Sequence, residues 1–281
     1  MASNRTRALN RTARIAWLAL GDRLGRPVPL VGIHSFPKSG NTWLRSILGT
    51  RLPSGRQGVP DLYKQSLADA ESLNGVRFYK HHGHSPLRRI DRVPVRTSHV
   101  IHIRRNPLDV FLSYMNFLSD NVTGKAPVRF PSVEAIAGTP LFDAYFSNFV
   151  ISGHIAQITP FAAGTGDCFS HNARWLARAR TDAQLRCLRY EDMLHDPSAA
   201  LAFLQDWIGL DAGAIAGMVR DAEGATRQDG RFFWRRQERN YLNFLSEQQI
   251  AFFLEHRGDQ AAQLGYDAAY FTPSVAGQEA R

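Results

Sequence analysis

Residues 34–44, HSFPKSGNTWL, contain a group of side chains that can bind an anion. The apolar run Val31–Ile33 precedes them and predicts a short strand, which then enters a tight turn at Gly40. An apolar-periodic segment opens at Thr42, so a helix is expected to begin just after the turn. The N–H groups and the positive dipole end of a helix N-terminus favour an anion, and Lys38 adds a full charge. We interpret this segment as a phosphate site.

Side chains that can form hydrogen bonds flank this lysine, namely those of Ser39, Asn41 and Thr42. Because the lysine precedes the glycine, the segment differs from the common nucleotide-binding loop GxxxxGK[ST]. A phosphoryl-transferring P-loop kinase would need Gly-Lys-Ser/Thr and an acidic Mg²⁺ ligand, so the turn does not favour one. A lysine in an ordinary surface turn is the alternative for this segment taken alone.

A second anion-binding signal lies at residues 102–117, HIRRNPLDVFLSYMNF. A strand is expected to end near Arg104, and Asp109 then falls in the first turn of a helix, where a carboxylate suits the dipole. Arg105 and Ser113 are eight residues apart. A helix packed beside the strand end can therefore bring a guanidinium and a hydroxyl to one phosphate. A salt bridge between Arg105 and Asp109 is the alternative for the arginine alone.

Residues 79–86, YKHHGHSP, combine a lysine with three histidines at a strand end. Alternate residues of a strand share a side, so Lys80 and His82 can face one way while His81 points away. An imidazole with an unperturbed pKa of about 6.5 can take a proton from a hydroxyl near neutral pH. Together with His84, these histidines also suggest a metal site. No carboxylate or cysteine accompanies them at a recognisable spacing, so no metal is expected.

Three further segments follow, GDCFSHNARWLA at 166–177, LRYEDMLHDP at 188–197 and WRRQERNYLNFLS at 234–246. His171 in the first is interpreted as a packed structural histidine. In the second, Glu191 and Asp192 are interpreted as cap and scaffold groups. Adjacent acids at a strand-to-helix junction are poor candidates for the paired carboxylates of a glycosidase-type hydrolase.

In their order along the chain, these segments resemble the motifs of PAPS-dependent sulfotransferases of the cytosolic type. PKSGNTW is similar to the family's 5′-phosphosulfate loop, PKSGTTW, and residues 105–113 match its 3′-phosphate motif, RNPxDxxxS. The resemblance implies an α/β fold in which helices flank a central parallel sheet with a P-loop-like architecture. It also implies that 3′-phosphoadenylyl sulfate, PAPS, binds at the carboxyl ends of the strands as the sulfuryl donor.

The resemblance gives each matching residue a role. It makes His82 the general base for the acceptor, with Lys80 contacting the transferring sulfuryl group and Lys38 holding the 5′-phosphosulfate, while Trp43 and Tyr190 would lie near the adenine. The residues implied to bind the cofactor are Lys38, Ser39, Gly40, Asn41, Thr42, Trp43, Arg105, Ser113, Tyr190, Arg235 and Arg236.

Two segments depart from the family pattern. Cys168 replaces the first Trp of the family's GSWFxHxxxW segment. The family's C-terminal loop, RKGxxGxWxxxLS, wraps the 3′-phosphate, but here both glycines are lost and Tyr241 replaces the Trp. Arg235 or Arg236 can still supply the charge, whereas close backbone N–H contacts depend on glycine. A basic surface loop before a helix is the alternative.

The expected function is therefore transfer of a sulfuryl group to a hydroxyl or amine of a small-molecule or glycan acceptor, without a metal. Loops at 52–75 and 118–165 are expected to form the acceptor pocket. Aromatic candidates for its walls, which can equally belong to the core, are Tyr114, Phe117, Phe142, Tyr145 and Phe146. The alternative is an inactive sulfotransferase-like protein that binds polyanions or nucleic acid, which the altered C-terminal loop and the net charge of +9 favour.

The composition is that of an ordinary globular protein, with 44% hydrophobic and 21% charged residues among 281. We expect a single domain over residues 1–281, with a basic helix or extension at 1–26 and a frayed tail at 272–281. No apolar run approaches the roughly 18 residues that span a bilayer. The two cysteines form no CxxC pair, which fits a reduced compartment, so a cytoplasmic protein is expected. No nucleic-acid partner is expected, and a homodimer remains open.

Short β-branched or aromatic runs alternate with longer helical patterns, which favours an α/β fold with a mostly parallel sheet. Strands are expected at residues 29–35, 76–81, 99–104 and 185–190. Helices are expected to begin near Thr42, Leu108 and Pro197, with others near Asn172 and Ser246.

Overall fold

The computed structural model of the chain describes residues 29–90, 93–154, 165–226 and 235–272, together with residues 13 and 16. The basic segment expected at 1–26 and the tail from 273 onward lie outside the described residues, apart from these two isolated positions. Among the described helices, none combines the length and the apolar character that a membrane crossing needs.

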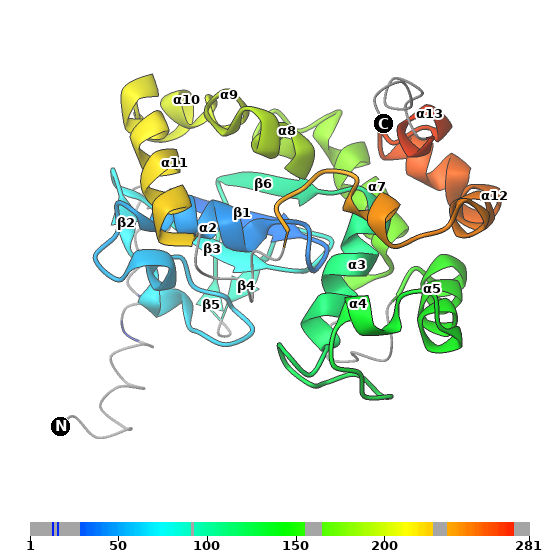
Figure 1. The fold of residues 1–281 in the computed structure, drawn as a ribbon. Coiled ribbons are helices and arrows are strands. Elements are labelled where there is room, and N and C mark those ends of the chain that lie inside the picture. The colour runs from blue at the N-terminus through cyan, green and yellow to red at the C-terminus, as the bar shows by residue number, and fades with distance from the viewer. Residues whose placement is uncertain are drawn as a thin grey trace.

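A five-stranded sheet of order β2-β3-β1-β6-β7 forms the centre of the structure (Figure 1). Its strands are β1 (Leu30–Ser35), β2 (Ser72–Leu73), β3 (Val76–His81), β6 (His99–Arg104) and β7 (Leu185–Arg189). The pairs β1–β3, β1–β6 and β6–β7 are parallel, and only the short edge strand β2 of this sheet runs antiparallel to its neighbour. The four strands expected from the sequence are confirmed, and with them the α/β class. A separate two-stranded pair joins β4 (Arg89–Ile90) and β5 (Val93–Pro94).

Helices connect the strands and cover both faces of the sheet. The α-helices are α2 (Asn41–Gly49), α3 (Pro107–Leu118), α4 (Val133–Ile136), α5 (Pro140–Ser152), α7 (Cys168–Ala179), α8 (Tyr190–His195), α9 (Pro197–Ala200), α10 (Leu204–Ile208), α11 (Ala212–Thr226), α12 (Glu247–Gln263) and α13 (Ala268–Phe271). Short 3₁₀ turns are η1 (Gly55–Gly58), η2 (Leu67–Asp69) and η3 (Asn240–Asn243).

The alternation of side chains along the central strands separates two buried layers. Val31 and Ile33 of β1 and Ile101 of β6 pack in one cluster with residues of α2, α8, α10 and α11. On the other face, Trp175 of α7 packs against Val100 and Leu185. In Figure 1, α8 to α11 lie along one side of the sheet, while α5, α12 and α13 gather beyond its far end.

A second core, rich in phenylalanine, joins α3, α5, α7, α12 and α13. Phe142 and Phe146 of α5 are fully buried in it, both in edge-to-face contact with Phe111 of α3. Tyr145 is also buried, and its hydroxyl hydrogen-bonds the backbone of Val128. These three aromatic residues, considered as acceptor-pocket walls, therefore belong to the core. Of the five candidates, Tyr114 and Phe117 line the pocket described below.

The strand order places β1 between β3 and β6, because the chain passes from β1 to β2 and β3 on one side and then crosses to β6 on the other. Ligands of open α/β sheets bind outside the carboxyl ends of the strands at such a switch point. The segments that follow β1, β3, β6 and β7 all emerge at this edge, and each contains one of the motifs singled out in the sequence.

Candidate functional site

The turn between β1 and α2 presents the N-terminus of α2 to a pocket. Gly40 adopts φ 108°, in the left-handed region, and a Cβ there would lie 2.4 Å from a ring carbon of Tyr190. Glycine is therefore required both by the backbone and by the close packing. Among the residues that the structure describes, no side chain caps α2, and the first turn of α2 carries no acidic residue. Its first N–H groups thus remain available to an anion.

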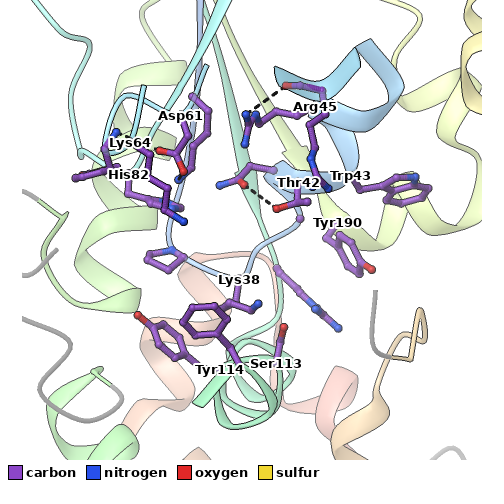
Figure 2. A pocket seen from close by; sticks show the side chains of 18 of the residues that line it. Lys38, Thr42, Trp43, Arg45, Asp61, Lys64, His82, Ser113, Tyr114 and Tyr190 are labelled. Atoms are coloured by element: carbon purple, nitrogen blue, oxygen red, sulfur yellow. Dashed lines mark hydrogen bonds and ion pairs between the residues drawn. The ribbon is translucent and has the colours of Figure 1, made fainter. Parts of the chain in front are cut away.

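A cavity of about 320 Å³ lies at this edge of the sheet (Figure 2). It is lined by Pro37, Lys38, Gly40, Asn41, Thr42, Trp43, Arg45, Arg56, Gln57, Asp61, Tyr63, Lys64, Gln65, Lys80, His82, Arg105, Ser113, Tyr114, Phe117 and Tyr190. In Figure 2, Trp43 and Tyr190 lie on one side, Asp61 and Lys64 lie on the other, and Lys38 lies between them.

Most of the residues singled out in the sequence meet in this cavity. Those that line it are Lys38, Gly40, Asn41, Thr42, Trp43, Lys80, His82, Arg105, Ser113 and Tyr190. Ser39 is buried within the turn, and its Oγ has no hydrogen-bond partner among the described residues. Asn41 supports the turn from inside, because its Nδ2 donates to Ser35 Oγ at 2.7 Å.

Two lysines in the cavity carry lowered pKa values because they are buried. Burial, together with the nearby positive charges of Arg105 and Lys80, lowers the pKa of Lys38 to about 8. Burial likewise lowers the pKa of Lys80 to about 8, although Asp61 opposes this shift. Lys38 also holds its Nζ 4.7 Å from the centre of the Phe117 ring. Both lysines remain mostly charged at neutral pH, so the cavity concentrates positive charge that an anion can neutralise.

Arg105 is fixed at the end of β6 by its neighbours. Its guanidinium lies 4.3 Å from the centre of the Tyr190 ring and 3.7 Å from Asp109. Asn106 caps α3 by accepting from the N–H of Asp109, and Glu191 accepts from the N–H of Asn106 at 2.9 Å. Glu191 thus acts as a scaffold group, as the sequence predicts, and the salt bridge between Arg105 and Asp109 forms as well.

His82 lies beyond the end of β3 with its ring buried. Its Nδ1 lies 2.8 Å from the carbonyl oxygen of Ser35. Because a carbonyl only accepts, Nδ1 carries the proton and Nε2 carries the lone pair. Burial and then the charge of Lys80 lower the pKa of His82 well below its ordinary value. The ring is therefore neutral at pH 7 and able to accept a proton at Nε2.

The two arginines from the C-terminal segment occupy different surroundings. Arg236 places its guanidinium 5.3 Å from the centre of the Trp43 ring and donates to Thr226 Oγ1. Neither arginine is among the residues that line the pocket, and Arg235 pairs with Glu134 of α4 at 3.4 Å. Only Arg236 therefore lies against a residue of the cavity through these contacts.

One wall of the cavity was not predicted residue by residue. It comes from residues 56–65, and its members are Arg56, Gln57, Asp61, Tyr63, Lys64 and Gln65. These residues carry no motif, and they reach the cavity through an isolated parallel bridge between Asp61 and Lys80. A pairing across some twenty residues leaves no local signal in the sequence, although the loop at 52–75 was expected to face an acceptor.

Comparison with protein families matches residues 29–228 to the model of the sulfotransferase domain. The chain belongs to the sulfotransferase family. A search of curated protein sequences gives no match. Among solved structures, the chain is similar to mouse sulfotransferase SULT7A1 complexed with PAP, with a TM-score of 0.56 and 17% sequence identity over 85% of this chain and 89% of that chain. At this sequence identity, the structural similarity shows the fold alone.

The sulfotransferase-family fold observed here agrees with the fold inferred from the sequence motifs. Among the described residues, no group of three or more His, Cys, Asp or Glu side chains is placed to hold a metal ion.

Proposed function

We propose that this member of the sulfotransferase family transfers a sulfuryl group from PAPS to a hydroxyl or amine of an acceptor. The observation that carries the proposal is the meeting of three cations, Lys38, Lys80 and Arg105, with the neutral His82 in one cavity. The cavity also receives the uncapped N-terminus of α2. Cations and a helix N-terminus suit a donor with several negative groups, and a neutral imidazole suits a proton acceptor.

The donor's parts would be distributed along the cavity. Lys38, Thr42 and the N-terminus of α2 would hold the 5′-phosphosulfate, while Arg105 and Ser113 would hold the 3′-phosphate. Trp43 and Tyr190, whose ring centres lie 5.9 Å apart, would contact the adenine. The buried Nε1 of Trp43, a residue that lines the cavity, has no hydrogen-bond partner among the described residues, and a polar ligand can provide one. The PAP complex of the mouse sulfotransferase supports this class of ligand.

The proposed reaction is an in-line displacement at sulfur. An acceptor oxygen forms a bond to the sulfur as the bond between sulfur and the 5′-phosphate oxygen breaks. The acceptor's proton passes to Nε2 of His82, and the negative charge goes to adenosine 3′,5′-bisphosphate, PAP. Lys38 and Lys80 would stabilise that charge, so positioning and electrostatics supply most of the catalysis.

The acceptor would approach from the wall formed by residues 56–65, with Tyr114 and Phe117 opposite. This wall is mainly polar, which suits a hydroxylated small molecule or a glycan. We also propose that residues 1–281 act as a single domain in the cytoplasm. The thiols of Cys168 and Cys187, both free, support a reducing compartment.

A turnover assay tests this proposal. The protein is incubated with PAPS and separate phenol, sugar and amine acceptors, and PAP release is measured beside mass spectrometry of the product. We expect PAP release that depends on one acceptor class and a product that is heavier by one sulfuryl group. Binding of PAP without sulfation of any acceptor class would instead favour the inactive binding protein.

A further inference from the structure

Asp61 is the one carboxylate among the described residues that line a cavity rich in cations. Its Oδ2 lies 3.0 Å from Nζ of Lys80. The two side chains are only 14% and 6% exposed. A carboxylate is unfavourable in a pocket for a polyanion, so its placement against a functional lysine calls for a reason.

The backbone fixes Asp61 beside Lys80. The N–H of Lys80 donates to Pro60 O at 2.8 Å, and the N–H of Leu62 donates to Lys80 O at 3.1 Å. The carboxylate is oriented as well, because its Oδ1 accepts from the N–H of Tyr63 at 3.2 Å while Oδ2 faces the lysine. The ion pair is therefore built into the cavity wall, with neither side chain free to swing without losing a contact.

Several basic groups among the described residues also bear on Lys80. These groups are Lys38, Arg45, Lys64, His81 and His82. The ring of Tyr63 covers the ammonium group as well, with its centre 5.4 Å from Nζ, and stacks on His81. Burial lowers the pKa of Lys80 to about 8 even with Asp61 present. Loss of the carboxylate would leave a buried lysine among like charges, which favours its neutral form.

We propose that Asp61 is a positioning residue that keeps Lys80 charged and aimed into the cavity, so that Lys80 meets the donor's sulfuryl group as a cation. This inference rests on the proposed function, in which Lys80 contacts that group. According to this proposal, Asp61 sets the pH above which donor recognition weakens, and it does so only through the charge of Lys80.

The first test measures the titration of Lys80 without any nucleotide. Amines are labelled with trace acetic anhydride between pH 6 and 10, and the Lys80 peptide is quantified by mass spectrometry. We expect Asp61→Asn, an isosteric change, to lower the midpoint of Lys80 by at least one pH unit. Asp120→Asn, which removes a carboxylate from a surface pair with Arg129, should leave it unchanged. An unchanged midpoint in Asp61→Asn overturns the proposal.

The second test measures the preference for PAPS over PAP by calorimetry from pH 6 to 9. We expect this preference to fade at a lower pH in Asp61→Asn than in the parent protein. In Lys80→Arg, whose arginine does not titrate in this range, the preference should fade less than in the parent protein, because only the titration of Lys38, with a pKa of about 8, then remains. If Lys80→Arg loses its preference for PAPS at alkaline pH to the same extent as the parent protein, the titration of Lys80 does not cause that loss and the proposal fails. If circular dichroism shows Asp61→Asn to be unfolded, Asp61→Ser, which also removes the carboxylate, replaces it in both tests with the same expected results.

The two tests separate this inference from the function on which it rests. Absence of PAP and PAPS binding in the parent protein contradicts the proposed function. The labelling midpoint still decides whether Asp61 controls the charge of Lys80.

Discussion

Two clusters of basic side chains lie close together at this sheet. One lies on the face that α7 covers, and the other lies in the cavity at the carboxyl ends of the strands. His81, His34 and His102 stand opposite one another on β3, β1 and β6, and we call these three the histidine row. Trp175 of α7 packs against the row, with its ring centre 4.7 Å from that of His34 and 5.6 Å from that of His102. His171 lies against His102 at 5.5 Å. The other cluster is the set of cavity cations around Lys38 and Lys80.

Burial has different consequences in the two clusters. In the histidine row it lowers the pKa of His34 to about 3 and of His81 to about 4, so these rings are neutral at pH 7. In the cavity, Lys38 and Lys80 retain pKa values of about 8 and stay mostly charged. A buried histidine can give up its charge and serve as packing, whereas a retained charge calls for an anionic partner. Burial alone therefore does not identify a functional basic group.

Acid should disrupt the histidine row most strongly. Well above pH 6.5 these histidines are neutral in both the folded and the unfolded chain, and as the pH falls through about 6.5 only the unfolded chain takes up protons. From pH 6.5 to 5.5, His34, His102 and His171, all fully buried with lowered pKa values, would together remove roughly 3 kcal/mol of unfolding free energy. Urea unfolding at pH 7.5, 6.5 and 5.5 measures this loss.

A neutral substitution provides the control for that measurement. His102 donates from Nε2 to Asn172 Oδ1 at 2.9 Å, and the amide of His102→Gln can reproduce this bond. The variant should lose less stability than the parent from pH 6.5 to 5.5, by about 1 kcal/mol. An unfolding free energy that is constant from pH 7.5 to 5.5 in the parent would contradict the conclusion that the buried histidines stay neutral in the folded chain.

His82 belongs to the cavity although its ring is buried like those of the row. We expect His82→Ala to lower turnover by about 10²–10⁴-fold, the range for loss of a general base, while PAP affinity stays within about twofold. The exposed His195, which pairs with Glu238, supplies the control variant His195→Ala. Steady-state rates and calorimetry measure the two effects. Retained turnover in His82→Ala would remove His82 from the base role.

Arg105 should affect nucleotide affinity rather than chemistry. Arg105→Ala is expected to weaken PAP binding by about 30- to 150-fold, which corresponds to about 2–3 kcal/mol for a charged hydrogen bond. Binding of 5′-AMP should change much less, because that ligand lacks the 3′-phosphate. Arg129→Ala, on the surface with Asp120, is the control. Equal losses for PAP and 5′-AMP would show that Arg105 supports the fold and does not read the 3′-phosphate.

The smallest expected change in PAP affinity concerns the two C-terminal arginines, Arg235 and Arg236. Arg236 lies over Trp43, so Arg236→Ala should weaken PAP binding by about three- to fivefold, consistent with a partly exposed cation–π contact of about 1 kcal/mol. Arg235→Ala should leave PAP affinity unchanged, because Arg235 pairs with Glu134 outside the cavity. Calorimetry measures the PAP affinity of both variants. A larger loss of affinity in Arg235→Ala than in Arg236→Ala would assign the contact with PAP to Arg235 instead.

The sequence was most informative where chemistry and local structure coincide. The central strands follow from apolar runs, and the start of α3 follows from Asn106 and Pro107 as cap and first helical residue. Lys38, Arg105 and His82 could be singled out because each stands near a strand end. Asp61 could not, because its pairing with Lys80 arises from a bridge between separate segments. The histidine row likewise depends on the register of three strands, which only the folded sheet defines.

The central claim is that the cavity recognises a nucleotide with both 5′- and 3′-phosphates. Calorimetric titration with PAP, beside 5′-AMP and ATP, tests it most directly. We predict PAP affinity on the order of micromolar, at least about 30-fold tighter than either comparison nucleotide. Equal affinity for PAP and 5′-AMP, or no binding of PAP, would contradict the claim.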